Sequence, residues 1–272
     1  MRELTYRDLT TLEEFANVVE LERQIWGPGY DEVVPVPILA VSVHRGGILI
    51  GAFDGDRMIG FVYSLPAIKD GKATQWSHMA GVVDEYRSAG LGRTLKLLQR
   101  DRTLAMGLDL IEWTYDPLQA MNAHLNFAKL GVVAEEYEVN VYGTSSSPLH
   151  AGNPTDRFVA EWKIRDPRVV LRLGGAAPLA PVLTLEPALR TKATGQWLEP
   201  AAPDLSIDAK RISVEIPTGF SSLLSQAPDL ALAWRMATRE AFTTYFARGY
   251  HAVEFFLDRE ARKGTYLLVK QA

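Results

Sequence analysis

The chain has 272 residues, with 29 Lys or Arg, 33 Asp or Glu and a formal net charge of −4. This slight acidity, without a dense Lys/Arg stripe, argues against a nucleic-acid partner. No cysteine is present, which excludes disulfides, thiolate metal sites and a cysteine-bound acyl intermediate, and we expect no metal.

The apolar content of 47% is ordinary for a globular protein and predicts a sizeable core. No apolar stretch approaches the roughly 18 residues that span a bilayer, so we expect no membrane partner. The first residues of the chain lack the apolar segment of a signal peptide. These patterns favour a soluble, cytoplasmic protein.

The N-terminal half alternates between helical and strand-like patterns. Residues 11–26 predict an amphipathic helix, because apolar side chains recur with a period of about 3.6 and Gly27-Pro28-Gly29 follows. Residues 47–68 predict a β-hairpin around an Asp-Gly-Asp turn. The elements expected next are a strand at 73–83, a helix at 93–106, a strand at 108–116, a helix at 117–130, a long strand at 132–143, a polar loop at 144–156 and a strand at 157–164.

The periodic signal weakens after this half of the chain, where Pro, Gly and Ala become frequent. We interpret residues 167–208 as a linker of irregular structure with some strand content. The segment beyond it predicts a β-α-β-β extension, with a strand at 211–216, a long helix at 229–248 and strands at 251–257 and 265–270. The predicted organisation is therefore a domain at 1–166, a linker at 167–208 and a C-terminal domain at 209–272.

The two halves of the chain share a repeated sequence pattern. An aromatic residue precedes a helix-ending glycine by four positions twice, as Phe127 with Gly131 and as Tyr245 with Gly249. Helix–glycine–strand is a common joint, because glycine readily adopts the left-handed conformation that ends helices. The repeated pattern is compatible either with this common connection or with a partial structural repeat.

The residues between the strand at 73–83 and the helix at 93–106 form a turn rich in glycine, residues 87–92, which we call the glycine turn. It contains Arg87, Gly90 and Gly92. The first amides of a helix have no intrahelical partner, and the helix dipole adds partial positive charge there. Glycines let a phosphate approach the backbone closely, and an arginine adds a charge-assisted contact. The pattern predicts a pyrophosphate site.

Two nucleotide-binding motifs do not fit this turn. The dinucleotide fingerprint needs a third glycine, and Leu95 occupies that position. A P-loop needs G-x-x-x-x-G-K-[ST], and no such run exists. The order Arg87-x-x-Gly90-x-Gly92 instead resembles the acyl-CoA loop of the GNAT acyltransferase superfamily, and the run "NFAKLGV" resembles that family's second motif.

The resemblance covers roughly residues 1–166 and implies a GNAT fold, an α/β architecture with a mixed sheet, here with the β-α-β-β extension. It also implies acetyl-CoA or another acyl-CoA as co-substrate, held in the gap between two splayed strands. Phe127 stands where many members have a tyrosine that protonates the leaving thiolate, so the usual acid is missing. The cofactor-binding residues implied are Val82, Val83, Arg87, Ser88, Ala89, Gly90, Leu91, Gly92, Arg93 and Phe127.

Transfer to an amine requires the neutral amine, and a lysine-like amine costs roughly 4.6 kcal/mol to deprotonate at pH 7. His78, on the strand before the glycine turn, is the first candidate base, because histidine titrates in the useful range. Glu112 is the second candidate base, and Tyr115 is a candidate substitute acid. A histidine that packs on the sheet is the structural alternative for His78.

Arg235 and Arg239 lie one helical turn apart on the predicted long helix and could hold a substrate carboxylate. The alternative is a solvated face, or ion pairs with Asp229 and Glu240. Only one R-x-x-G-x-G run exists, so we expect a single CoA site.

These features predict an acyl-CoA-dependent N-acyltransferase that transfers acetyl or another short acyl group directly to a primary amine of a small molecule, for example an amino acid. One alternative is a catalytically degenerate protein that binds CoA as a sensor or scaffold. Another is an aminoacyl or thiol-linked transferase, against which the net charge of −4 argues mildly. The acyl group, the acceptor and a homodimeric state are left open.

Overall fold

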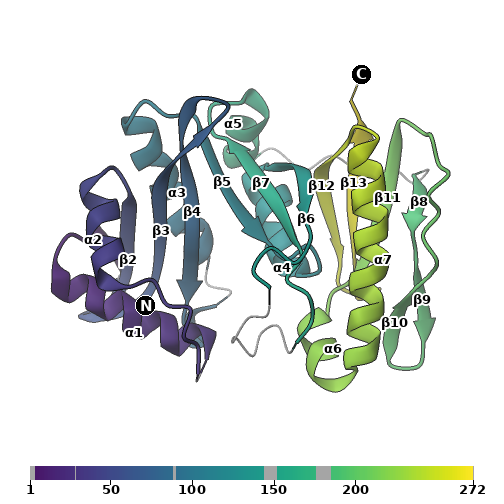
Figure 1. Ribbon diagram of the computed structural model, residues 1–272, viewed down its shortest axis with the longest axis horizontal. Helices are drawn as coiled ribbons and strands as arrows, with labels where there is room; N and C mark the ends of the chain where they lie inside the picture. Colours follow the sequence, from purple (N-terminus) through teal and green to yellow (C-terminus); the bar gives the residue numbers. More distant parts are fainter. Residues whose placement is uncertain (1–3, 28, 88–89, 144–151, 176–184, 272) are drawn as a thin grey trace. The chain divides into compact units, whose positions relative to one another are not determined.

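The computed structural model describes residues 4–27, 29–87, 90–143, 152–175 and 185–271. Contacts divide the chain into two compact units (Figure 1). Unit 1 comprises residues 1–113, 146–148 and 163–165, and unit 2 comprises residues 114–145, 149–162 and 166–272. The two units are described separately below.

Unit 1 contains a mixed sheet in the order β1-β2-β3-β4-β5. Neighbouring strands are antiparallel except for the parallel pair β4–β5. Its elements are β1 (Leu4–Asp8), α1 (Leu12–Trp26), α2 (Val36–His44), β2 (Ile48–Asp54), β3 (Arg57–Lys69), β4 (Lys72–Val82), the 3-10 turn η1 (Asp84–Tyr86), α3 (Leu91–Ala105) and the first part of β5 (Leu110–Tyr115). The sequence did not predict β1 or α2.

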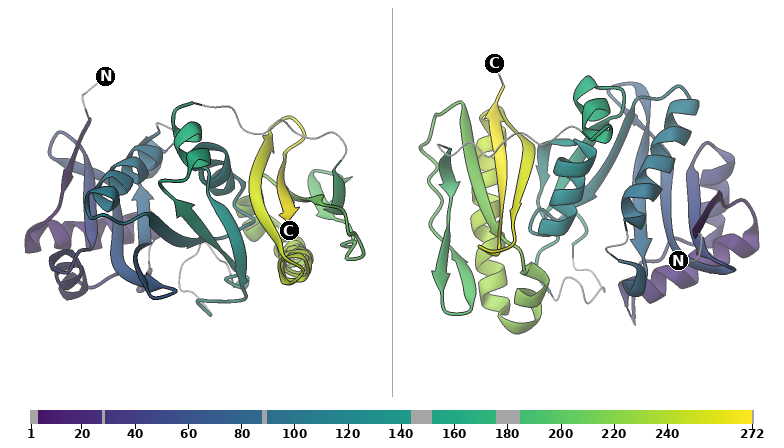
Figure 2. Two further views of the ribbon diagram at one scale, coloured as in Figure 1. Left: turned by 90° about the horizontal axis from the view of Figure 1, so that it is seen from above. Right: turned by 180° about the vertical axis from the view of Figure 1, so that it is seen from behind.

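Helix α1 begins with a capping box, in which Thr11 accepts from the amide of Glu14 and the Glu14 carboxylate accepts from the amide of Thr11. Its apolar face packs into a core that includes Phe15, Val18 and Phe61. Helices α1 and α2 lie on one face of the unit 1 sheet and α3 on the other (Figure 2). The predicted α/β fold class with a mixed sheet is confirmed.

Unit 2 contains strands in the order β7-β6-β12-β13-β11-β8, antiparallel except for β8–β11. The long helix α7 runs along this sheet (Figure 1). Besides the end of β5, its elements are α4 (Ala120–Ala123), the π-helix η2 (His124–Leu130), β6 (Val133–Glu138), β7 (Arg157–Lys163), α5 (Pro167–Leu173), β8 (Glu186–Leu189), β9 (Thr191–Thr194), β10 (Trp197–Pro200), β11 (Arg211–Pro217), α6 (Phe220–Gln226), α7 (Pro228–Ala247), β12 (Tyr250–Asp258) and β13 (Lys263–Lys270).

The two helix–glycine–strand segments of unit 2 match in their backbone. Gly131 and Gly249 both adopt the left-handed conformation, with φ of 77° and 79°. A β-bulge follows each glycine at the same distance, in β6 after Ala134 and in β12 after Ala252. Those two alanines pair directly where β6 meets β12. These features support a partial repeat, which remains an inference.

Three expectations from the sequence need correction. The region 167–208 is not irregular throughout, because α5, β8 and the hairpin β9–β10 lie in it. Each is too short to show a period, which is why Pro and Gly dominated the pattern. Strand β6 ends at Glu138, and the helix expected at 117–130 begins at Ala120 and continues as a π-helix. The domain bounds stay a prediction, and the division by contacts assigns residues 114–145 to unit 2.

Candidate active site at the split between two strands

Strands β4 and β5 pair only briefly within unit 1. The parallel ladder joins Gln75 with Ile111 and Trp76 with Glu112, and among the described residues no pairing of the two strands follows. Strand β4 nevertheless continues to Val82, paired with β3 on its other side. The backbone edge of β4 that faced β5 is therefore released beyond Trp76, as the resemblance predicted.

A β-bulge lies in β4 just beyond the ladder. Ser64 pairs with Ser77 and Tyr63 pairs with Met79, so His78 is the extra residue. Ser77 contacts α3 through Lys96, whereas a Cβ on Gly81 would meet Ile25 and Trp26 of α1. Ser77 and Gly81 are four residues apart and would share one face of a regular strand. Here they face opposite sides of the sheet, so the bulge reverses the alternation of side chains along β4. Trp76 therefore lies on the face opposite Ala80 and Val82, whereas an uninterrupted strand would place all three on one face.

The glycine turn leads directly into α3. Gly90 is the N-cap residue of this helix, with φ of 83°, and no side chain caps the helix. A Cβ on Gly90 would meet no atom within 4 Å, so the space in front of the first turn is open. Leu91, Gly92 and Arg93 form that first turn. Ser88 and Ala89 lie outside the described residues.

Arg87 lies beside this helix start. Its side chain is half exposed. One terminal guanidinium nitrogen lies 2.8 Å from a carboxylate oxygen of Asp84, and Nε donates to the carbonyl oxygen of Val82. Val83 is buried, and its amide donates to the carbonyl oxygen of Ile59, which ties the end of β4 to β3. The turn thus has a fixed entry, a left-handed glycine and an uncapped helix start, the requirements of an anion site.

His78 is surface-accessible, and its ring contacts Tyr63 edge-on at 5.9 Å between centroids. Partial desolvation by neighbouring atoms lowers the pKa of His78 from its usual value. The imidazole is therefore neutral near pH 7 and able to accept a proton.

Glu112 is not placed as a free base. Its side chain is buried, one carboxylate oxygen lies 3.0 Å from Nζ of Lys69, and the other accepts from Thr74 at 3.4 Å. Because Glu112 pairs in register with Trp76, it lies on the face opposite Ser77 and α3. The ion pair with Lys69 gives the Glu112 carboxylate a structural role.

Tyr115 and Phe127 belong to the core of unit 2. The Tyr115 hydroxyl lies 3.2 Å from that of Tyr266, which donates to the carbonyl oxygen of Pro117. Burial raises the pKa of Tyr115 well above its usual range. Phe127 is fully buried and contacts both tyrosine rings edge-on. The Tyr115 hydroxyl is held against Tyr266 in the core of unit 2, so this geometry gives Tyr115 no role as the substitute acid.

Arg235 and Arg239 are ion-paired within unit 2. Arg235 binds Asp116 through two hydrogen bonds of 2.8 and 2.7 Å, and Arg239 binds Asp156 through two of 2.8 Å. The partners are not Asp229 and Glu240, the alternative considered from the sequence. Both guanidinium forks are occupied by the chain's own carboxylates, so neither is free to hold a substrate carboxylate in this way.

Two buried ionisable side chains of unit 1 were not among the site residues expected from the sequence. Lys96 on α3 donates to Ser77 at 2.8 Å, and burial lowers the pKa of Lys96 to about 7. Glu22 on α1 accepts from the amide of Val34 at 2.9 Å, while its other carboxyl oxygen is buried without a partner. Burial raises the pKa of Glu22 to about 7. Glu22 falls on the apolar face of α1 with Phe15 and Val18, which indicated its burial, whereas no pattern in α3 singled out Lys96.

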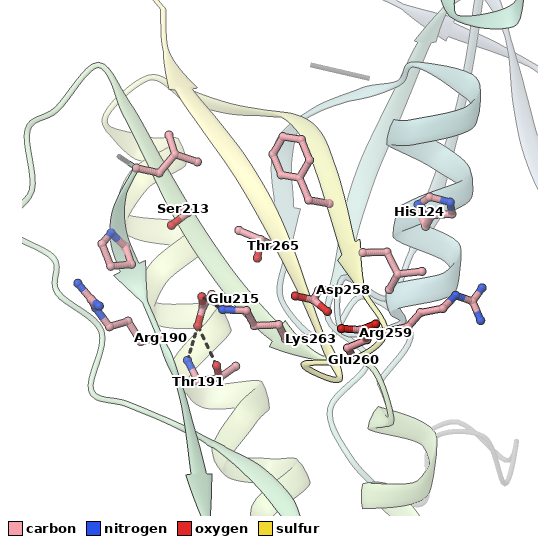
Figure 3. A pocket seen from close by; sticks show the side chains of 14 residues that line it. His124, Arg190, Thr191, Ser213, Glu215, Asp258, Arg259, Glu260, Lys263 and Thr265 are labelled. Carbon is pink, nitrogen blue, oxygen red and sulfur yellow. Dashed lines mark hydrogen bonds and ion pairs between the residues drawn. The ribbon is translucent and has the colours of Figure 1, made fainter. Parts of the chain in front are cut away.

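A groove of about 1050 Å³ lies in unit 2 (Figure 3). Glu215 holds Thr191 and Lys263 on one side of it, and Asp258, Arg259 and Glu260 line the other. Its charges are mixed, and it includes no residue of the glycine turn. In the described part of the chain no cluster of three metal-ligating side chains occurs. None of the helices described is both long and apolar enough to cross a membrane.

No family model and no curated protein matches this chain. Solved structures match in part. The ribosomal-protein-S18-alanine N-acetyltransferase from Escherichia coli matches at 16% identity over 60% of this chain and 94% of that chain, with a TM-score of 0.48. The PaiA N-acetyltransferase from Thermoplasma acidophilum in complex with coenzyme A matches at 17% identity over 59% and 99%, with a TM-score of 0.42.

A GNAT-family acetyltransferase from Streptococcus pneumoniae matches at 15% identity over 58% of this chain and 98% of that chain, with a TM-score of 0.47. All three of these solved proteins are acetyltransferases. With identities below 20% and TM-scores below 0.5, they do not fix the substrate of this chain. They leave about 40% of the chain unmatched.

Proposed function

We propose that this protein is an acyl-CoA-dependent N-acyltransferase that transfers acetyl or another short acyl group to the primary amine of a small molecule. The observation that carries the proposal is the uncapped start of α3, with Gly90 in the left-handed conformation, at the end of a strand whose edge is released. The pyrophosphate of CoA would bind the first amides of α3, and Arg87 would add a charge.

The released edge of β4 suits the other end of the co-substrate. A pantetheine arm carries amide groups, and an unpaired strand edge offers backbone donors and acceptors to such groups. The bulge at His78 leaves that residue without a partner in the β3 ladder, so its backbone is free to bind the thioester carbonyl. The acyl carbon would then lie beside the His78 imidazole.

His78 would accept the proton of the attacking amine. Neutral imidazole accepts a proton near pH 7, and general-base catalysis of this kind contributes about 10²- to 10⁴-fold in rate. The chain has no cysteine to carry an acyl group, so we propose direct transfer in a ternary complex. The small-molecule acceptor is inferred from the sequence alone.

The alternative function is a protein that binds CoA without transferring its acyl group. Phe127 and Tyr115 favour it, because the usual tyrosine acid is missing and the nearest substitute is buried with Tyr266. The test is thiol release from acetyl-CoA in the presence of a panel of primary amines, with mass spectrometry of the products. Amine-dependent thiol release with an N-acetylated product supports the enzyme. Tight CoA binding without transfer to any amine supports the alternative.

A further inference from the structure

The Lys96 amine lies at the point where β4 and β5 separate. Ser77 and Trp113 are the first residues beyond the ladder on these two strands. Nζ of Lys96 is 2.8 Å from the Ser77 hydroxyl oxygen on β4 and 3.7 Å from the ring centroid of Trp113 on β5. The amine therefore contacts both strands at the mouth of the split, from the helix that begins at the glycine turn.

No carboxylate in the described part of the chain pairs with this amine. Its polar contacts are Ser77 and the amide oxygen of Gln99, at 3.4 Å. Gln99 also donates to the Ser77 hydroxyl at 3.0 Å. This second hydrogen bond fixes the position of the hydroxyl to which Lys96 donates. A buried lysine without a counter-ion is costly to a fold, because water no longer stabilises the ammonium. Buried lysines with a strongly shifted pKa cluster at sites where a protein transfers a proton.

The surrounding elements explain why the amine titrates so low. Strand β2 carries no titratable side chain between Ile48 and Phe53, and Tyr63, the one such group of β3 between Met58 and Ile68, donates to Ser42 of α2. On β5, Glu112 pairs with Lys69 on the opposite face, and on α3, Arg100 donates to the carbonyl oxygen of Ile164. Burial alone thus lowers the pKa of Lys96 to about 7.

We infer that Lys96 is the general acid of the transfer reaction and protonates the CoA thiolate in place of the missing tyrosine. This inference rests on the proposed function. The pantetheine arm in the split would bring the sulfur beside the first residues after the ladder, where Nζ lies. An ammonium at this place also attracts the developing negative charge before the proton moves.

The step balances as follows. The acceptor nitrogen attacks the thioester carbonyl, the C–N bond forms, and the nitrogen's proton passes to His78. The C–S bond then breaks with its electron pair on sulfur, and sulfur takes a proton from Lys96. A free thiol has a pKa of about 8.5 and the Lys96 amine one of about 7, and the charge of the ammonium lowers the thiol pKa toward that of the amine, so the proton passes between two coupled groups of nearly matched pKa. Solvent returns a proton to Lys96 after CoA leaves and removes one from His78.

The test uses Lys96→Met, which keeps the length of the side chain and removes its charge, with the exposed lysine variant Lys72→Met as the matched control. The first readout is the ultraviolet absorbance of the CoA thiolate as bound CoA is titrated with alkali. In wild type and the control, the ammonium should lower the apparent pKa of the bound thiol below its value in free CoA. In Lys96→Met that pKa should return to the free value or rise above it.

The second readout is turnover, with CoA affinity measured by calorimetry. Lys96→Met should bind CoA like wild type and lose about 10²-fold in kcat, the usual contribution of a general acid. The wild-type kcat should also fall as pH rises through about 7, a limb that the variant lacks. Should the variant unfold, the thiol titration in wild type decides alone, and an unshifted bound thiol overturns the inference.

A failure of the inference differs from a failure of the proposed function. CoA binding and acyl transfer that are equal in wild type and Lys96→Met would overturn the role of Lys96 and leave the transferase standing. A melting temperature that changes while the bound thiol titrates as before would show a purely structural lysine, which also overturns it. Absence of CoA binding to wild type would overturn both.

Discussion

Both units contain ion pairs of buried groups, including Glu112 with Lys69 in unit 1, but two other buried groups of unit 1 differ from the buried pairs of unit 2. Unit 2 pairs Arg172 with Glu254 at 2.7 Å and Arg235 with Asp116 at 2.7 Å, each side chain less than a tenth exposed. Unit 1 buries Lys96 and Glu22 with no ion-pair partner among the described residues. Burial without a partner shifts a pKa toward neutrality, and both groups titrate at about 7.

The difference separates groups that hold a fold from groups that exchange a proton. A paired arginine and carboxylate keep their charges across the physiological range, so they contribute geometry and no proton transfer. A group that titrates near 7 gains or loses a proton at little cost, which general acid–base chemistry requires. Unit 1, which contains the glycine turn, contains two such groups, Glu22 and Lys96.

The largest expected effect comes from breaking a pair in unit 2. Asp116→Asn leaves the Arg235 guanidinium buried without its counter-charge, and we expect a loss of about 3–5 kcal/mol in the free energy of unfolding. Chemical denaturation of the variant measures it. Lys270→Ala, which removes the exposed ion pair with Asp208, is the control and should leave the free energy of unfolding nearly unchanged. Equal losses in the two variants would contradict the account of paired burial.

The opposite result is expected when an unpaired group of unit 1 is removed. The pKa of Glu22 is raised from 4.5 to about 7 on folding, so the folded state binds the extra proton between these values. Stability is therefore fully present below pH 4.5, declines as pH rises toward 7 and stays low above it. Glu22→Gln removes this penalty and should stabilise the protein by roughly 3 kcal/mol at pH 8, with little change at pH 4.

Denaturation curves at the two pH values check the Glu22 prediction. The amide of Val34 keeps an acceptor in the variant, because glutamine retains a carbonyl oxygen. A variant that is less stable than wild type at pH 8 would show that the Glu22 carboxylate stabilises the fold as an anion. Lys96 would then be the only example of a costly unpaired group in the comparison of the two units.

A smaller effect is expected at His78, where the expected change is in rate rather than stability. His78→Gln should lower kcat/KM by about 10²-fold at pH 6.5 and by less as pH approaches the pKa of the acceptor amine. The reason is that the free amine then needs no base. Steady-state kinetics from pH 6 to 9 measure this, since the pKa of His78 lies below its usual value and the imidazole stays neutral over most of that range. A variant indistinguishable from wild type throughout would place the base elsewhere.

The sequence predicted the elements with strong periods and the turn between them. Strand β4, helix α3 and the extension β11–α7–β12–β13 were all expected near their observed bounds. Helix α2 was missed, because "VPILAVSVH" is apolar on all sides and shows no helical period. Strand β1 was missed because its five residues, "LTYRD", are too short and too polar to stand out.

The site was predicted only in part, because much of it depends on tertiary contacts. The bulge at His78 arises from the register between β3 and β4, which no local pattern reveals. Lys96 resembles any polar residue of an amphipathic helix until Ser77 and Trp113 are placed against it. Arg235 and Asp116 are 119 positions apart, so their pairing could not be read from helical spacing.

The central claim is that the pyrophosphate of CoA binds the uncapped start of α3. Calorimetry of CoA binding to wild type and to Gly90→Asn tests it most directly. Asparagine tolerates the left-handed backbone of Gly90 better than other residues, so the turn should keep its shape while the added side chain occupies the open space before the helix. We expect wild type to bind CoA and the variant to lose at least about tenfold in affinity with an unchanged melting temperature. Equal affinity in the two proteins, or no CoA binding to wild type, would contradict the account.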